Sequence, residues 1–295
     1  MKNTALFRLH FIVFLWGFTA ILGKLVNANA QILVFYRMLF AAVFLFVFLR
    51  VFRKQSIAVS KKLFLQLAVV GTFMAFHWLC FFYSIKVSNV SISLSCLSIC
   101  TLFVAILEPV VFKRKMDISE VIMGIVILVC MYLIFQTEFR YKEGIFYGIL
   151  TALLGAIFSV FNGKLYGKTS SGNIIFYEIF IGWTVLSVFY LFTGQISQLS
   201  EISYLDLALI TLLASVFTAY PMFESIRLMK YITPFTLALT VNLEPVYGII
   251  LAFFIFGESE HMSPVFYIAS LVMILSIVAN GIIKARKRAL QLNNN

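Results

Sequence analysis

The chain has 295 residues, of which 62% are hydrophobic and only 12% carry a charge. A soluble domain carries about twice that share of charged residues, so most side chains must lie in lipid or in an apolar core. The formal net charge of +11 does not indicate nucleic-acid binding, because the basic residues stand in the breaks between apolar runs, as they do in the cytoplasmic loops of membrane proteins. The composition therefore predicts an all-α membrane protein.

Ten apolar segments can be marked along the chain, and each is near the roughly 20 residues that a helix needs to cross a bilayer. They cover residues 9–26, 31–49, 63–85, 90–112, 119–136, 145–163, 173–193, 204–225, 232–256 and 264–283. The breaks between them are short, which leaves no room for a soluble domain.

The basic residues predict the orientation of these segments. If the N-terminus is cytoplasmic, most of the Lys and Arg residues fall on the inner side, and only Lys24, Lys86, Arg140 and Lys142 fall on the outer side. This bias is the positive-inside pattern. It predicts a multi-pass protein of the inner (plasma) membrane with both termini in the cytoplasm.

An internal repeat divides the chain into residues 1–143 and 144–295. Phe35-Tyr36-Arg37 recurs as Phe176-Tyr177-Glu178, and Thr101 aligns with Pro245. With five segments in each half, the second half must cross the membrane in the opposite sense to the first. The sequence thus predicts two inverted five-helix repeats, an architecture common among secondary transporters. The tetrapeptide that follows Ile106 also recurs from Leu243 to Val246, but its offset disagrees with this register, and we treat it as partly coincidental.

The ninth segment is the most informative. It carries Glu244 and Pro245 near its middle. A carboxylate at that depth costs about 2.5–3.5 kcal/mol on insertion scales, and proline removes a backbone hydrogen bond and kinks a helix. Both are tolerated where neighbouring helices or a wet cavity compensate, so this helix is expected to line a polar site.

These features together resemble the EamA family of the drug/metabolite transporter superfamily. The resemblance is carried by Trp16-Gly17, by Arg37, and by the run from Tyr231-Ile232-Thr233-Pro234 through Asn242-Leu243-Glu244-Pro245-Val246 to Gly257-Glu258. It implies a ten-helix secondary transporter of the inner membrane, usually an exporter, of amino acids, their relatives or other small metabolites.

Three ionisable residues are expected to share one layer of the membrane. With about 1.5 Å per residue across a core of roughly 30 Å, Arg37 and His77 lie about 9 Å and Glu244 about 12 Å from the outer face. We predict that they line a central substrate cavity, with Tyr36, Trp78, Asn242 and Trp183 nearby. Arg37 suits a substrate carboxylate, and Glu244 suits an ammonium group or a proton. The alternative is a structural Arg37–Glu244 pair, with His77 as an ordinary core residue.

The remaining acidic residues receive structural interpretations. Glu178, the repeat counterpart of Arg37, is expected to lie toward the inner face and to reach Lys164 or Lys168. Glu108 and Glu224 are expected to meet nearby basic residues at the cytoplasmic ends of their helices. Glu258, Glu260 and His261 are expected to form a solvated outer turn.

Enzymes and channels are the competing functional classes. Neither a Walker motif nor the HExxH and GxSxG patterns are present, and Cys80, Cys96, Cys100 and Cys130 form no CxxC pair. We therefore expect no ATP hydrolysis, no metal or other cofactor and no catalysis. The alternatives are a membrane enzyme acting on a lipid or lipid-linked substrate, or a channel. As a carrier, the chain would use a gradient of substrate, protons or a counter-substrate, and its partners would be that small molecule and the bilayer.

Overall fold

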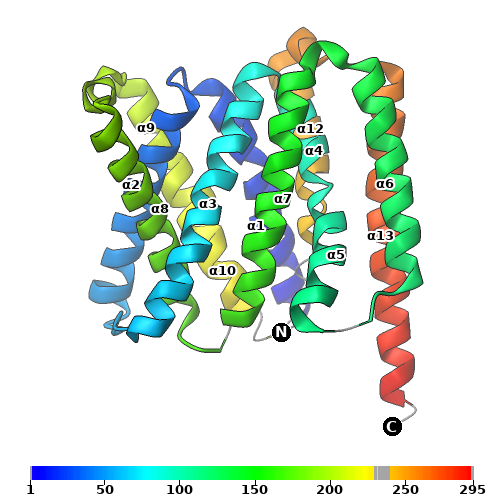
Figure 1. Ribbon diagram of the computed structural model, residues 1–295, viewed down its shortest axis with the longest axis horizontal. Coiled ribbons are helices and arrows are strands. Elements are labelled where there is room, and N and C mark those ends of the chain that lie inside the picture. The colour runs from blue at the N-terminus through cyan, green and yellow to red at the C-terminus, as the bar shows by residue number, and fades with distance from the viewer. Residues whose placement is uncertain (1, 114, 166, 229–230, 232–239, 294–295) are drawn as a thin grey trace.

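The computed structural model describes residues 2–113, 115–165, 167–228, 231 and 240–293. Within these residues the chain consists of helices joined by short connections (Figure 1). The α-helices are α1 (Lys2–Leu25), α2 (Ala30–Val47), α3 (Lys61–Val87), α4 (Val90–Leu97), α5 (Cys100–Phe112), α6 (Ile118–Thr137), α7 (Lys142–Leu165), α8 (Ser171–Thr193), α9 (Tyr204–Ala214), α10 (Tyr220–Leu228), α12 (Glu244–Phe256) and α13 (Pro264–Asn293). The π-helical turns are η1 (Phe48–Phe52) and η4 (Ser215–Ala219), and the 3-10 turns are η2 (Phe139–Tyr141), η3 (Ile196–Glu201) and η5 (Gly257–Glu260).

Nine helical stretches of the described chain are long and apolar enough to cross a membrane. They are Thr4–Leu25, Ala30–Phe52, Lys61–Val87, Val90–Phe112, Ile118–Thr137, Phe139–Leu165, Ser171–Thr193, Tyr204–Ser225 and Pro264–Ile283. Each overlaps one predicted segment, so the all-α membrane class is confirmed. The remaining predicted segment, 232–256, includes residues 232–239 outside the described part and continues as α12.

The helices form one bundle whose two chain ends lie at the same face (Figure 1). Helices α6 and α13 lie side by side at one edge, where residues such as Ile127 and Met273 share a buried apolar cluster. The larger core cluster joins α2, α3, α8 and α9. Helix α1 packs on α12 with little space between the backbones, because a Cβ added at Gly17 would lie 3.0 Å from Cβ of Tyr247. Close approach through small residues is how membrane helices gain packing energy.

The fourth stretch matches the predicted segment 90–112, but its helix is interrupted near the middle. Helix α4 ends at Leu97 and α5 begins at Cys100. The Ser93 and Ser98 hydroxyls donate to the carbonyls of Asn89 and Leu94, four residues earlier, and such bonds compete with the helical ladder and bend helices. The serines therefore supply a local reason for the break.

A second helix begins in the middle of the bundle and meets this break. Helix α12 starts at Glu244, with Pro245 in its first turn, where the missing N–H costs nothing. The Thr101 hydroxyl donates to Oδ1 of Asn242 at 2.9 Å, so this hydrogen bond joins the start of α5 to the residues just before α12. Thr101 and Pro245, which the predicted repeat register aligns, are each the second residue of their helix.

The π turn η4 shapes the eighth segment. Pro221 stands two residues after its last residue, Ala219, and a proline ring clashes with the carbonyl four residues earlier, here that of Phe217 inside η4. The wider turn relieves this clash and carries the Thr218 side chain into the bundle, where it is buried. π turns of this kind occur often at functional sites.

On the predicted outer face, the carboxylate of Glu260 is buried. This corrects the expectation that Glu260 lies in a solvated turn. Glu260 is 0% exposed. Its two oxygens accept bonds from the N–H groups of Val90 and Ser91 at 3.0 and 2.8 Å, and Lys24 Nζ lies 2.8 Å from Oε1. A carboxylate at a helix N-terminus satisfies amides that lack intrahelical partners, so docking of the turn onto α4 buries the acid.

Candidate functional site

Arg37 on α2 is the centre of the candidate site. Its side chain is buried inside a predicted membrane span. Nε donates to the Thr218 hydroxyl at 3.0 Å, and the guanidinium carbon lies 3.9 Å from the centroid of the Trp78 ring. The Phe82 ring lies further off, at 5.2 Å. Cation–π stacking of this kind stabilises a desolvated arginine by about 2 kcal/mol. Nη1 is buried without a hydrogen-bond partner in the described part of the chain.

His77 and Glu244 lie close enough for their charges to interact with that of Arg37. Among the described residues, Arg37 and Glu244 form no ion pair within the 4.0 Å limit. The alternative of a direct structural pair between α2 and α12 is therefore not what this structure contains. His77 Nδ1 lies 2.8 Å from the Thr151 carbonyl of α7, so this ring nitrogen already has a hydrogen-bond partner.

Asn242 extends this group toward the helix breaks. It precedes Glu244 by two residues and accepts the bond from Thr101. Cys100, at the start of α5, lies near enough to Glu244 for an electrostatic interaction with its carboxylate. The site thus combines a cation on α2, a carboxylate at the start of α12, and polar groups at both helix breaks.

Two predicted site residues lie apart from the Arg37 contacts. The Tyr36 hydroxyl donates to the Leu199 carbonyl in η3 at 2.8 Å, so it ties α2 to a loop. The Trp183 ring packs 6.1 Å from Phe35, and its buried Nε1 has no partner among the described residues. Tyr36 therefore anchors the loop that contains Leu199, and Trp183 packs within a group of aromatic side chains.

Thr218 was not predicted as a site residue. It lies far from Arg37 in sequence, and a threonine in an apolar run is an ordinary packing residue. The usable signal was Pro221 three residues later, which predicts a distorted helix.

The structural prediction for Glu224 is confirmed, and that for Glu178 is wrong. Glu224 pairs with Arg227 and with Arg8, each at 3.3 Å, as expected for a helix end. Glu178 does not reach Lys164 or Lys168. It is 1% exposed and accepts a bond from Asn162 Nδ2 at 3.1 Å. Lys168 instead donates to Gln66 of α3 at 3.1 Å.

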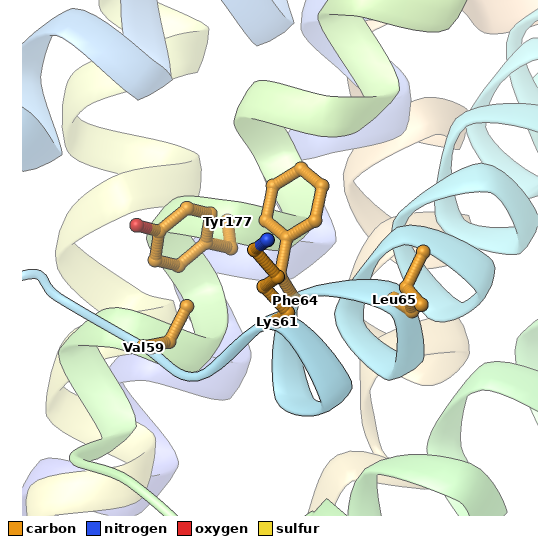
Figure 2. A pocket seen from close by; sticks show the side chains of 5 residues that line it. All are labelled: Val59, Lys61, Phe64, Leu65 and Tyr177. Carbon is orange, nitrogen blue, oxygen red and sulfur yellow. The ribbon is translucent and has the colours of Figure 1, made fainter.

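Two surface hollows lie at the ends of the bundle and not at Arg37. One, of about 420 Å³, is formed where the chain enters α3 and meets α8. Figure 2 shows Phe64 and Tyr177 in this hollow with the Lys61 amine between them. The other, of about 640 Å³, lies among the loops after α6 and α12. In the described residues no group of three or more His, Cys, Asp or Glu side chains is placed to hold a metal ion.

The fold and the polar site inside it define a multi-pass helical membrane protein. A family model for the EamA-like transporter family matches the chain twice, over residues 4–136 and 142–281. The chain belongs to this family, which has two repeated domains. Its two matches nearly coincide with the halves drawn from the internal repeat.

Two known proteins are similar to this chain. The chain is 25% identical over 258 residues to YxxF, an uncharacterized transporter of Bacillus subtilis (strain 168), covering 85% of this chain and 81% of that protein. A crystal structure described only as that of a protein superposes with a TM-score of 0.65 at 11% identity, covering 97% of this chain and 99% of the other. At that identity the second likeness concerns the fold alone.

Proposed function

We propose that this protein is a secondary transporter that exports a small zwitterionic metabolite, such as an amino acid or a related compound. The observation that carries the proposal is the state of Arg37. Its guanidinium is buried, held by Thr218 and Trp78, and not neutralised by direct contact with Glu244. A carboxylate that bonded to Nη1 would supply the missing partner through a charge-assisted bond.

Glu244 provides the opposite end of the proposed site. A molecule with a carboxylate and an ammonium group would place one on Arg37 and the other on Glu244, whose charges interact without pairing. The starts of α5 and α12 flank this position. Helices that begin near the bilayer midplane commonly form transporter binding sites, because their free N–H groups face the substrate.

We further propose that the two halves are inverted and that the chain crosses the plasma membrane ten times, with both ends cytoplasmic. Helix α1 begins and helix α13 ends at the same face of the bundle (Figure 1). A chain that starts and finishes on one side of a membrane must cross it an even number of times. Nine described stretches qualify as spans, and the segment that continues as α12 would be the tenth. Alternating access would then follow from rocking of the two halves around the Arg37 site.

Flux into liposomes tests the proposal. A thermal-shift screen of the purified protein against amino acids, nucleosides, sugars and cationic drugs identifies a ligand, and proteoliposomes then measure its exchange. Saturable exchange that is lost in Arg37→Gln, together with altered selectivity in Glu244→Gln, supports the proposal. A non-saturable flux would indicate a channel, and chemical modification of the lipid would indicate an enzyme. A Glu244→Gln variant with unchanged selectivity would exclude Glu244 from the site.

A further inference from the structure

A second buried polar pair lies away from the Arg37 site. Glu178 on α8 and Asn162 on α7 are joined by the bond from Nδ2 to Oε2, at 3.1 Å. Oε1 of Glu178 and Oδ1 of Asn162 are both buried and have no hydrogen-bond donor in the described part of the chain. Each side chain therefore has one buried acceptor that lacks a donor among the described residues.

The buried position of Glu178 keeps its carboxylate away from lipid and disfavours a permanent negative charge on it. Helix α3 crosses α8 directly at Glu178, since a Cβ added at Gly71 would lie 2.7 Å from the Glu178 carbonyl oxygen. An ionised carboxylate buried with only an amide donor is poorly compensated. Protonation of the carboxylate removes this uncompensated charge.

The charged groups on the helices around α8 have other partners. Arg37 bonds to Thr218, His77 lies against the Thr151 carbonyl, and Lys164 lies 5.9 Å from the Phe112 ring centroid. On α10, Glu224 and Arg227 pair with each other, and Lys61 lines the surface hollow at the start of α3. Among the described residues, none of these forms an ion pair or hydrogen bond with Glu178.

We propose that Glu178 and Asn162 form a proton-binding site that couples a proton gradient to transport. The step is the addition of one proton to the Glu178 carboxylate, giving a neutral carboxylic acid, and its later release on the other side. Asn162 suits both forms, because rotation of its amide exchanges the donor Nδ2 for the acceptor Oδ1. A metal cation fits less well, since the pair offers few oxygens and Nδ2 faces the carboxylate.

The location of the pair explains how protonation would influence the carrier cycle. Helix α3 belongs to the first half of the chain, whereas α7 and α8 belong to the second. Charge on Glu178 would therefore change the energy of the contact between the halves. The hollow shown in Figure 2 reaches Tyr177, the residue before Glu178 on α8, whereas the Glu178 side chain itself is buried.

The first test needs no substrate and is independent of the proposed transport. Infrared spectra of the purified protein, recorded during a pH titration, should show the carbonyl stretch of a buried carboxylic acid. This band should be missing in Glu178→Gln and shifted in Asn162→Ala. It should be unchanged in Glu143→Gln, which removes an exposed carboxylate. A spectrum of Glu178→Gln identical to that of the unaltered protein would overturn the proposal.

The second test rests on the proposed function. In proteoliposomes with an imposed pH gradient, the unaltered protein should show uptake several times that measured without the gradient. In Glu178→Gln this ratio should fall to one, whereas Glu143→Gln should keep it. A ratio that persists in Glu178→Gln contradicts the coupling role. If no substrate is transported at all, the proposed function fails, and the infrared result still decides whether Glu178 binds a proton.

Discussion

Tyr36 and Tyr177 make the same kind of hydrogen bond from equivalent positions in the two halves of the chain. The Tyr36 hydroxyl donates to the Leu199 carbonyl at 2.8 Å, and the Tyr177 hydroxyl donates to the Ile57 carbonyl at 2.9 Å. Each tyrosine thus holds a loop of the other half. This reciprocity supports the inverted repeat proposed above, and it places one interhalf tie toward each face of the bundle.

Replacing either tyrosine with phenylalanine should weaken these ties independently. We expect Tyr36→Phe and Tyr177→Phe each to lower the free energy of unfolding by about 0.5–1.5 kcal/mol, the net value of one hydrogen bond. The two effects should add in the double variant, because separate sites behave additively. Thermal unfolding in detergent measures both. Tyr204→Phe is the control, since Tyr204 is 93% exposed, and a loss as large in that variant would contradict the assignment.

A lysine at position 37 should not reproduce the substrate binding expected of Arg37. An ammonium group keeps the charge but lacks the planar face that stacks on Trp78 and the Nε donor that bonds to Thr218. We expect Arg37→Lys to weaken binding of an identified substrate by about tenfold or more, which corresponds to about 1.4 kcal/mol. Binding measured by calorimetry checks this, and wild-type affinity in Arg37→Lys would show that only charge matters.

Removal of the Thr218 hydroxyl tests how much its hydrogen bond to Arg37 contributes to stability, without changing Arg37 itself. Thr218→Val leaves the buried Nε of Arg37 without its acceptor, which should cost about 1–3 kcal/mol of stability. Thr184→Val is the matched control, because the exposed Thr184 hydroxyl bonds only to the Phe180 carbonyl of its own helix. Equal unfolding midpoints for the two variants would show that the Arg37–Thr218 bond contributes nothing.

The two members of the Lys24–Glu260 pair should differ in importance. Glu260 is buried and also accepts two backbone bonds at the start of α4, whereas the Lys24 side chain is 23% exposed. We expect Glu260→Ala to cost about 3 kcal/mol or more and Lys24→Met at most about 1 kcal/mol. Chemical denaturation of both variants tests this ranking, and the reverse order would refute the capping role of Glu260.

A methyl group at Gly71 should force α3 and α8 apart. Its Cβ would lie 2.7 Å from the Glu178 carbonyl oxygen, and backbone cannot move aside as a side chain can. We expect Gly71→Ala to destabilise the protein by about 1–3 kcal/mol. In the control Gly163→Ala, the nearest atom is at the tip of the Phe112 ring, at 3.3 Å. That variant should remain close to the unaltered stability, and a loss equal to that of Gly71→Ala would show that the crossing is loosely packed.

The sequence predicted the spans well because apolar length decides them. The predicted segment 119–136 and helix α6 (Ile118–Thr137) differ by one residue at each end, since the polar break before α6 supplies the capping acid Asp117. Arg37 and Glu244 also stood out, because charge in an apolar run is rare whatever the tertiary structure.

What the sequence did not predict depends on contacts between distant segments. Glu260 lies in a run that reads as a solvated turn, and only the docking of that turn onto α4, 170 residues away, buries it. The same holds for Glu178, whose partner Asn162 lies on a different helix. Local patterns contain no information on which helices cross at which residues.

The stacking of Arg37 on Trp78 supplies an optical reporter inside the protein. The chain has three tryptophans, at positions 16, 78 and 183. Replacing Trp16 and Trp183 with phenylalanine leaves a single indole directly beneath the guanidinium. Any molecule that draws the guanidinium off the ring then changes the fluorescence of that indole, so occupancy of the site can be followed by emission alone, without a label.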